Sequence, residues 1–580
     1  MMTDDLRPYL EAARGDRPVD LLIAGVRIVD VFSGAVRSGD IAVFRETIVG
    51  IGEYTHKQRL DLHGYYAAPG FIDAHVHIES AMLDVPAFVR AVLPRGTTSV
   101  VADPHEIANV MGADGLRHML QSAVQQPMDL YFSLPSCVPA TDMETAGARL
   151  SAEDLHPFIR MDRIVALAEM MNYPGAVQGE KGVLQKIAAA RAAGKPVDGH
   201  APGVGGKPLS AYILAGMSSD HECTSAAEAL EKLRAGMFIM VREGTGARNL
   251  AALLPLVNAH TAARMMWCTD DRHPQDLMDD GHIDALVRQA IAAGVDPVTA
   301  IRMATLSPAG YFGLRCKGAI GPGRTADIVF FRDLSKPVIE KVMARGKLVA
   351  ENGRMRPAAA TPAAVCPPPS IHVRRAAVDL TVAAVSGRMR VIEAVEGQVR
   401  TGQCVCRPAL RDGKAVADPG RDLLKLAVIE RHCASGRTGI GFVKGFKLKK
   451  GALAASVAHD SHNIIILGTT DEDMYAALDE LIRVGGGLAV VRDGKPAAVL
   501  PLPVAGLMST DPLPVVRRRL DRLTAAARGM GCTLHDPFMT LSFLALPVIP
   551  RLKLSDRGLI DVERFEFVPL FVDDKAQDMV

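Results

Sequence analysis

Two histidines in residues 70–79 are the first side chains whose types and spacing suggest chemistry. His75 and His77 are two positions apart, so on a β-strand both imidazoles point to the same face. Apolar neighbours surround the pair, as expected at the end of a buried strand: Phe71, Ile72, Val76 and Ile78. Such a pair alone is more often structural, so a metal site requires further ligands at the ends of later strands.

Four further candidate ligands follow short apolar runs. Glu169 ends the run 164–168, and Asp270 ends the run 265–269. His200 and His221 each follow a short segment that could end a strand. All four lie where a strand would give way to a loop, and barrel enzymes place their active sites at that end of the strands.

The combined set has the composition of a metal centre. Four histidines and two carboxylates suit Zn²⁺, Mn²⁺ or Fe²⁺. Two ions bridged by a carboxylate would lower the pKa of a shared water towards neutrality and provide a hydroxide nucleophile. The candidate metal ligands are His75, His77, Glu169, His200, His221 and Asp270.

The segment that must position these residues has an α/β texture. Short apolar runs alternate with Ala- and Leu-rich helical stretches, which predicts parallel βαβ units. Predicted strands include 99–102, 164–168 and 265–268, and predicted helices include 182–193 and 225–234. Because about 250 residues is the usual size of a (β/α)8 barrel, we expect one TIM-like barrel over residues 64–317.

The flanking segments predict two more domains. Short β-branched runs at 19–58 and 318–356 favour one small β-sandwich domain that the barrel splits, although two independent strand clusters are the alternative. A proline-rich linker, 357–370, then leads to a further α/β region with a hairpin at Asp493-Gly494. The expected fold is therefore α/β, with a TIM-like barrel, a split β-sandwich and a C-terminal α/β domain. Its expected boundaries are 1–63, 64–317, 318–356, 357–370 and 371–580.

Composition excludes several classes of partner. The 580 residues carry 66 basic and 65 acidic side chains without a basic run, which argues against nucleic acid or a membrane surface. The first residues are acidic and polar, unlike a targeting signal. Nine scattered cysteines, an odd number, indicate reduced thiols and a cytoplasmic protein.

The order of the six candidate ligands resembles the amidohydrolase superfamily, and longer motifs narrow the resemblance. Residues 96–110 (GTTSVVADPHEIANV) are similar to the bacterial adenine deaminases. Four further barrel motifs and one C-terminal motif share this similarity: 219–222 (SDHE), 241–244 (VREG), 268–274 (CTDDRHP), 281–284 (GHID) and 457–463 (VAHDSHN). The resemblance covers nearly the whole chain.

The resemblance implies hydrolysis of free adenine to hypoxanthine and ammonia at a binuclear Mn²⁺ or Fe²⁺ centre. The six candidate ligands match the superfamily positions, with Glu169 where many relatives have a bridging carboxylated lysine. A homodimer or homotetramer is also expected. The alternatives are another metal-dependent amidohydrolase that acts on a cyclic amidine or amide, and a catalytically dead barrel scaffold.

The proposed chemistry assigns roles to further residues. Asp270 is the expected general base, and Glu222 is the expected acid, although Glu222 could instead cap a helix or face solvent. One cluster could hold an additional metal, orient the ligands or serve only as a loop: Asp103, His105 and Glu106. Another set could contact the purine or form ion pairs at the mouth: Arg242, Glu243 and Asp271.

The run of polar residues at 459–463 (HDSHN) precedes an apolar strand at 464–467. We expect this run at a domain interface, with closure over the substrate, metal contact and a surface loop as alternatives.

Overall fold

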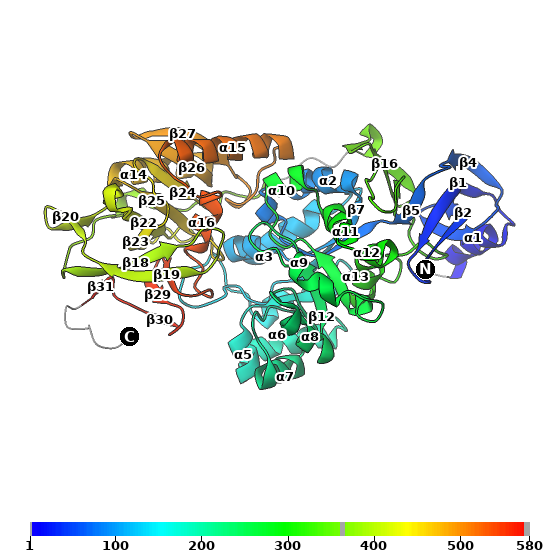
Figure 1. The fold of residues 1–580 in the computed structure, drawn as a ribbon, viewed down its shortest axis with the longest axis horizontal. Coiled ribbons are helices and arrows are strands. Elements are labelled where there is room, and N and C mark those ends of the chain that lie inside the picture. Colours follow the sequence, from blue (N-terminus) through cyan, green and yellow to red (C-terminus); the bar gives the residue numbers. More distant parts are fainter. Residues whose placement is uncertain (1–2, 360–365, 573–580) are drawn as a thin grey trace.

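The computed structural model describes residues 3–359 and 366–572. Part of the predicted linker, residues 360–365, lies outside the described residues. Figure 1 shows a small β region next to the N-terminus, an α/β region in the middle and a second sheet region that ends at the C-terminus. Within the described residues, no helix combines the length and the apolar character needed to cross a membrane.

The small β region is a nine-stranded sheet with strands from both sides of the central region. Its N-terminal strands are β1 (Val19–Asp30), β2 (Ala35–Phe44), β3 (Thr47–Ile51), β4 (His56–Asp61) and β5 (Tyr66–Pro69). Its later strands are β14 (Ile328–Phe331), β15 (Lys341–Ala344), β16 (Lys347–Glu351) and β17 (Arg354–Met355), and helix α1 (Thr3–Arg14) precedes β1. Antiparallel pairing of β5 with β14 joins the two halves. Since β5 belongs to this sheet, the sheet extends to Pro69, beyond the expected boundary at residue 63.

The central region contains two parallel sheets. The first has the order β10-β9-β8-β7-β6 and the second has the order β11-β12-β13. Their strands are β6 (Phe71–Val76), β7 (Thr97–Ala102), β8 (Asp129–Leu134), β9 (Ile164–Met170), β10 (Val197–Gly199), β11 (Ser219–Asp220), β12 (Phe238–Arg242) and β13 (Met265–Cys268). Single parallel bridges, Val76 to Asp270 and Val197 to Met217, connect the edges of the two sheets. The predicted strands at 99–102, 164–168 and 265–268 are confirmed.

Helices cover the outer side of these strands, so β6, β7, β9 and β13 are buried throughout. The helices are α2 (Val85–Val92), α3 (His105–Ser122), α4 (Ala152–Leu155), α5 (Tyr173–Gln178), α6 (Lys181–Ala192), α7 (Gly206–Ala215), α8 (Ala226–Arg234), α9 (Leu250–Leu253), α10 (Pro274–Asp279), α11 (Ile283–Ala292), α12 (Pro297–Met303) and α13 (Leu306–Tyr311). The predicted helices at 182–193 and 225–234 correspond to α6 and α8.

The C-terminal region is built on a second nine-stranded sheet. Its strands are β18 (Arg388–Ala394), β19 (Thr401–Cys406), β22 (Leu424–Ile429), β23 (Thr438–Lys444), β24 (Ala452–Ala455), β25 (Ile464–Gly468), β26 (Gly487–Arg492), β27 (Lys495–Pro501) and β31 (Phe571–Val572). Smaller sheets use β20 (Ala409–Arg411), β21 (Lys414–Val416), β28 (Leu552–Ser555), β29 (Gly558–Asp561) and β30 (Glu566–Phe567). The helices are α14 (Asp471–Val484), α15 (Leu513–Gly529) and α16 (Pro537–Phe543).

Local sequence explains the main features of this sheet. Asp493 and Gly494 both have positive φ and form the two-residue turn of the β26–β27 hairpin, which confirms the predicted hairpin. Met474, Leu478 and Leu481 recur at helical spacing along α14 and pack on the sheet beside Ile466.

The C-terminal region packs against loops that follow the central strands. Ser509 exchanges backbone hydrogen bonds with Met82 and Asp84, each 2.9 Å long. Asp556 accepts hydrogen bonds from the backbone and hydroxyl of Thr145, at 2.9 and 2.7 Å. The carboxyl ends of the central strands are therefore next to a second domain.

Lys553 is a buried cation in this region whose partners are backbone carbonyls. Its amine donates to Val399 and Phe543 at 2.8 Å each, and burial lowers its pKa to about 7. Between that pH and the pKa of an unfolded lysine, the unfolded chain binds one more proton, so this group contributes stability that rises with pH.

We predict that Lys553→Met raises the free energy of unfolding at pH 6 and loses this advantage as the pH rises. The gain in the free energy of unfolding of Lys553→Met over the wild type should fall by about 3 kcal/mol between pH 6 and pH 9.5, measured by urea denaturation. Lys449→Met is the matched control because this exposed lysine also donates to a backbone carbonyl, at 3.0 Å from Pro419. Equal pH dependence in the two variants would contradict the burial argument.

Candidate metal centre

Four histidines from three strand ends converge in the central region. His75 lies in β6 and His77 directly follows it, and their Nε2 atoms are 3.1 Å apart. The rings of His75 and His221 stack with centroids 4.4 Å apart, and those of His200 and His221 meet edge to face at 5.3 Å. The carboxyl ends of parallel strands lie at one edge of a sheet, which explains how residues far apart in the chain meet here.

Glu169, in β9, lies between the two histidine pairs. Its Oε1 is 3.3 Å from Nε2 of His77, whereas its Oε2 is 2.5 Å from Nδ1 of His200 and 3.2 Å from Nε2 of His221. Each carboxylate oxygen therefore faces a different pair of histidines. Asp270 approaches from the end of β13, with Oδ1 3.1 Å from Nε2 of His77.

The ionisation of these groups follows from their mutual contacts. Burial alone would raise the pKa of Glu169, but the charges of His221 and His200 outweigh it and hold that pKa well below its usual value. Burial would lower the pKa of His221, yet Glu169 and Asp270 raise it to about 9. Burial also works against ionised Asp270, whose pKa is nevertheless held well below its usual value, chiefly by Arg242 and His77.

Asp103 and His105 lie beside this group at the end of β7. Nδ1 of His105 is 3.1 Å from the Asp103 carboxylate and 3.7 Å from Glu169, and Nδ1 of His77 is 3.0 Å from the backbone oxygen of Asp103. Ligand atoms of His77, Asp103, His105 and Glu169 all lie within 4.8 Å of one another.

Glu106 points towards the C-terminal region instead. Its Oε1 lies 3.0 Å from Oγ of Ser80 and 3.7 Å from Nδ1 of His459. Burial and the nearby carboxylate of Glu79 raise its pKa well above the usual value. Sequence reasoning missed Glu79, although it stands two positions after His77 and is buried.

Arg242, at the end of β12, joins Glu222 to Asp270. It donates to both oxygens of Glu222, at 2.5 and 2.8 Å, and to Oδ2 of Asp270 at 2.5 Å. Oε1 of Glu222 is also 3.4 Å from Nε2 of His221. Of the two roles weighed for Arg242, the structure places it in ion pairs.

The other residues weighed for substrate contact have different neighbours. Glu243 accepts from the backbone of Leu250 at 3.2 Å, and this bond directs its carboxylate to its own loop. Asp271 accepts from the Ser80 hydroxyl at 2.5 Å, so it lies near Glu106.

The polar run 459–463 is buried against the central region. Its members are His459, Asp460, Ser461, His462 and Asn463, and all are at most 8% exposed. We expect this run at a domain interface, and the burial of its five residues agrees with that position. The run contacts the central region through His459, whose Nδ1 lies 3.7 Å from Oε1 of Glu106, and through Asn463, which donates to the backbone of Thr145 at 2.8 Å.

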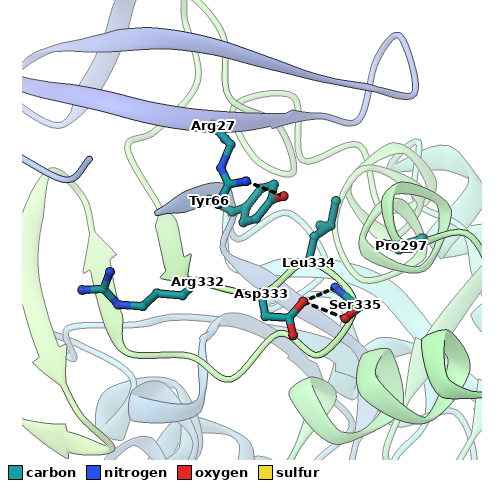
Figure 2. Close-up of a pocket in the computed structure, with 7 residues that line it drawn as sticks. All are labelled: Arg27, Tyr66, Pro297, Arg332, Asp333, Leu334 and Ser335. Carbon is teal, nitrogen blue, oxygen red and sulfur yellow. Dashed lines mark hydrogen bonds between the residues drawn. The ribbon is translucent and has the colours of Figure 1, made fainter. Parts of the chain in front are cut away.

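A surface cleft of about 490 Å³ lies elsewhere, at the edge of the small β region (Figure 2). The guanidinium of Arg27 lies 3.7 Å above the ring of Tyr66 and donates a hydrogen bond to the Tyr66 hydroxyl at 2.9 Å. The residues that line this cleft include none of the buried histidines or carboxylates described above. The chemistry is therefore concentrated at the histidine cluster.

The donor set of the cluster fits divalent transition-metal ions. Nitrogen and carboxylate oxygen atoms of His75, His77 and Asp270 lie within 4.8 Å of one another, and the same holds for His75, Glu169 and His221. Such a set of buried imidazole and carboxylate donors suits Mn²⁺, Fe²⁺ or Zn²⁺. None of the free cysteines belongs to these groups.

Comparisons with known proteins agree with the geometry. Residues 66–349 match the amidohydrolase family, and residues 398–566 match the adenine deaminase C-terminal domain. An adenine deaminase of Desulfatibacillum aliphaticivorans is 50% identical over 575 residues, which cover 98% of this chain and 100% of the relative. Those of Kosmotoga olearia and Methanothrix thermoacetophila are 46% and 45% identical, over 97% and 99% of this chain and 98% and 100% of the relatives. This chain belongs to the adenine deaminase family of metal-dependent amidohydrolases.

Proposed function

We propose that the chain hydrolyses adenine to hypoxanthine and ammonia at the histidine cluster. The observation that carries this proposal is the position of Glu169, which faces one histidine pair with each carboxylate oxygen. The relatives named adenine deaminase support the choice of substrate. A dead scaffold would be expected to lose ligand positions, whereas all six predicted residues are present and meet at one place.

Two divalent ions, Mn²⁺ or Fe²⁺, are the proposed cofactors. His75, His77 and Asp270 would hold one ion, His200 and His221 would hold the other, and Glu169 would contact both. Divalent ions bound there would supply Lewis acidity, which lowers the pKa of water towards neutrality. Asp103 and His105 are proposed to orient the ligands, with an additional metal ion as the alternative.

Asp270 and Glu222 transfer the protons of the reaction. Water adds to C6 of adenine and gives a proton to Asp270, while Glu222 protonates a ring nitrogen. Asp270 then gives its proton to the amine, the C6–N bond breaks and ammonia leaves, while the C6 hydroxyl returns a proton to Glu222 as the carbonyl forms. Both oxygens of Glu222 accept hydrogen bonds from Arg242, so the acid role requires one of these bonds to open when the substrate binds.

We also propose how the sheets close and how the chain divides into domains. The two parallel sheets would close as one eight-stranded (β/α)8 barrel, with the two bridges at their edges as support. The small β region would be a split sandwich domain, followed after the linker by the C-terminal domain. A cytoplasmic dimer or tetramer is proposed as well, and the odd number of scattered cysteines in the sequence favours the cytoplasm.

We predict that removal of metal with a chelator abolishes adenine turnover, followed as loss of purine absorbance and release of ammonia. Addition of Mn²⁺ should restore the activity at two equivalents per chain, because two histidine groups flank Glu169. The reconstituted protein should act on adenosine at less than about one hundredth of its rate on adenine. Full activity in metal-free protein, or a preference for adenosine, would overturn the proposed function.

We predict that Arg242→Lys lowers kcat by about 10- to 100-fold while metal content stays unchanged. Lysine keeps the charge but cannot form the bidentate fork, so charge-assisted hydrogen bonds to Glu222 and Asp270 are lost. The pH–rate profile should also shift, since both carboxylates lose a cationic partner. Arg248→Lys is the control, because this exposed arginine pairs with Asp276 at 3.1 Å. A variant within threefold of wild type with an unchanged profile would remove Arg242 from the mechanism.

A further inference from the structure

The C-terminal domain places a buried carboxyl group, with one oxygen unpartnered within the described part of the chain, beside the loops that follow the central strands. Asp460 lies between β24 and β25 and is 4% exposed. Its Oδ1 is 3.8 Å from Nδ1 of His459, and its Oδ2 has no hydrogen-bond partner among the described residues. Burial of a carboxyl oxygen without a partner costs free energy, so such a group in a native protein requires an explanation.

The segment around Asp460 is held on both sides. Asn463 donates to the backbone of Thr145 at 2.8 Å, which fixes the segment to the central region. The ring of His459 stacks on Phe543, at the end of α16, with centroids 4.7 Å apart. The buried guanidinium of Arg431 donates to the backbone oxygen of His462. Asp460 is thus presented by a supported segment rather than by a loose loop, as a binding residue should be.

A cation is the first alternative partner for this segment. Ligand atoms of Glu106, His459 and His462 lie within 4.8 Å of one another. However, Nδ1 of His462 accepts a hydrogen bond from the backbone of Ala458 at 3.2 Å. A neutral ring that accepts through Nδ1 carries its proton on Nε2, the atom that faces Glu106 at 3.9 Å. A protonated nitrogen cannot bind a metal ion, so this contact disfavours a third cation.

Adenine is a better candidate than a cation for the missing hydrogen-bond partner of Asp460 Oδ2. The reacting carbon of adenine, C6, must face the metal ligands at the strand ends. The imidazole ring then points away from the reacting amine, and it carries an N–H that a nucleoside replaces with ribose. A protein group that binds this N–H must therefore come from outside the ring of ligands. The C-terminal domain packs against the loops that follow the central strands, and Asp460 belongs to the segment that contacts them.

We propose that Asp460 accepts a hydrogen bond from the imidazole N–H of adenine and thereby selects the free base over the nucleoside. This inference rests on the proposed function of the histidine cluster. An analogue without the N–H leaves the buried carboxyl unpaired, and sites built on such a bond reject analogues that lack it by large factors. The C-terminal domain is then part of the substrate site.

The test compares adenine with 9-methyladenine in the manganese-loaded full chain. Asp460→Ala should raise the KM for adenine by about 100-fold and change the inhibition constant of 9-methyladenine by less than threefold. Asp460→Asn keeps an acceptor oxygen and should lose only about 10-fold. If a variant is inactive, calorimetric binding of hypoxanthine and 9-methylhypoxanthine gives the same comparison, because hypoxanthine also carries the imidazole N–H.

Asp556→Asn is the matched control, because Asp556 belongs to the same interface but bonds to Thr145. It should leave both constants unchanged. Thermal stability of Asp460→Ala should equal or exceed that of the wild type, since the variant removes an unpaired buried carboxyl. Equal losses for the methylated and unmethylated bases, or loss of bound metal in Asp460→Ala, would overturn the assignment. A failure of the proposed function would appear separately, as adenine turnover that survives chelation in the wild type.

Discussion

The site depends on the contacts of one buried carboxylate, Glu169. A carboxylate and several imidazoles cannot share a dry space unless their charges compensate, because burial penalises every ion. Glu169 meets that constraint by facing His77 with one oxygen and His200 and His221 with the other. The strand ends β6, β9, β10 and β11 bring these groups together, and a shift of any one strand would separate Glu169 from a histidine.

The guanidinium of Arg242 contacts both proposed acid–base groups, Glu222 and Asp270. Glu222 and Asp270 both lie near His221, and a single guanidinium between them donates hydrogen bonds to both carboxyl groups. One planar side chain therefore contacts both carboxyl groups, and its fork geometry orients Glu222 through two parallel hydrogen bonds. Substrate must compete with this cation for the carboxylate oxygens.

Much of this organisation could be predicted from local sequence. His75 and His77 share a face because strands have a period of two, and Asp493-Gly494 specifies a hairpin because both positions need positive φ. The partners of Arg242 could not be predicted, since side-chain pairing between β12 and β13 leaves no periodic signal. An interface position was expected for residues 459–463, but the surfaces that cover them could not be predicted, because Thr145 and Phe543 are distant in the chain. The burial of Glu79 beside Glu106 was missed because a single acidic residue carries no spacing pattern.

The pairing of β5 with β14 has a consequence for synthesis of the protein. Ile328 faces Pro69 in that pair, so the partner strand leaves the ribosome about 260 residues after β5. At ordinary translation rates this interval is roughly 13 to 50 seconds. During that time one side of β5 has an open edge, and open edges recruit strands from other chains. Nascent chains of this protein are therefore vulnerable to co-aggregation on crowded polysomes until the later half emerges, and a chaperone that shields the edge for that interval would improve the yield of folded enzyme.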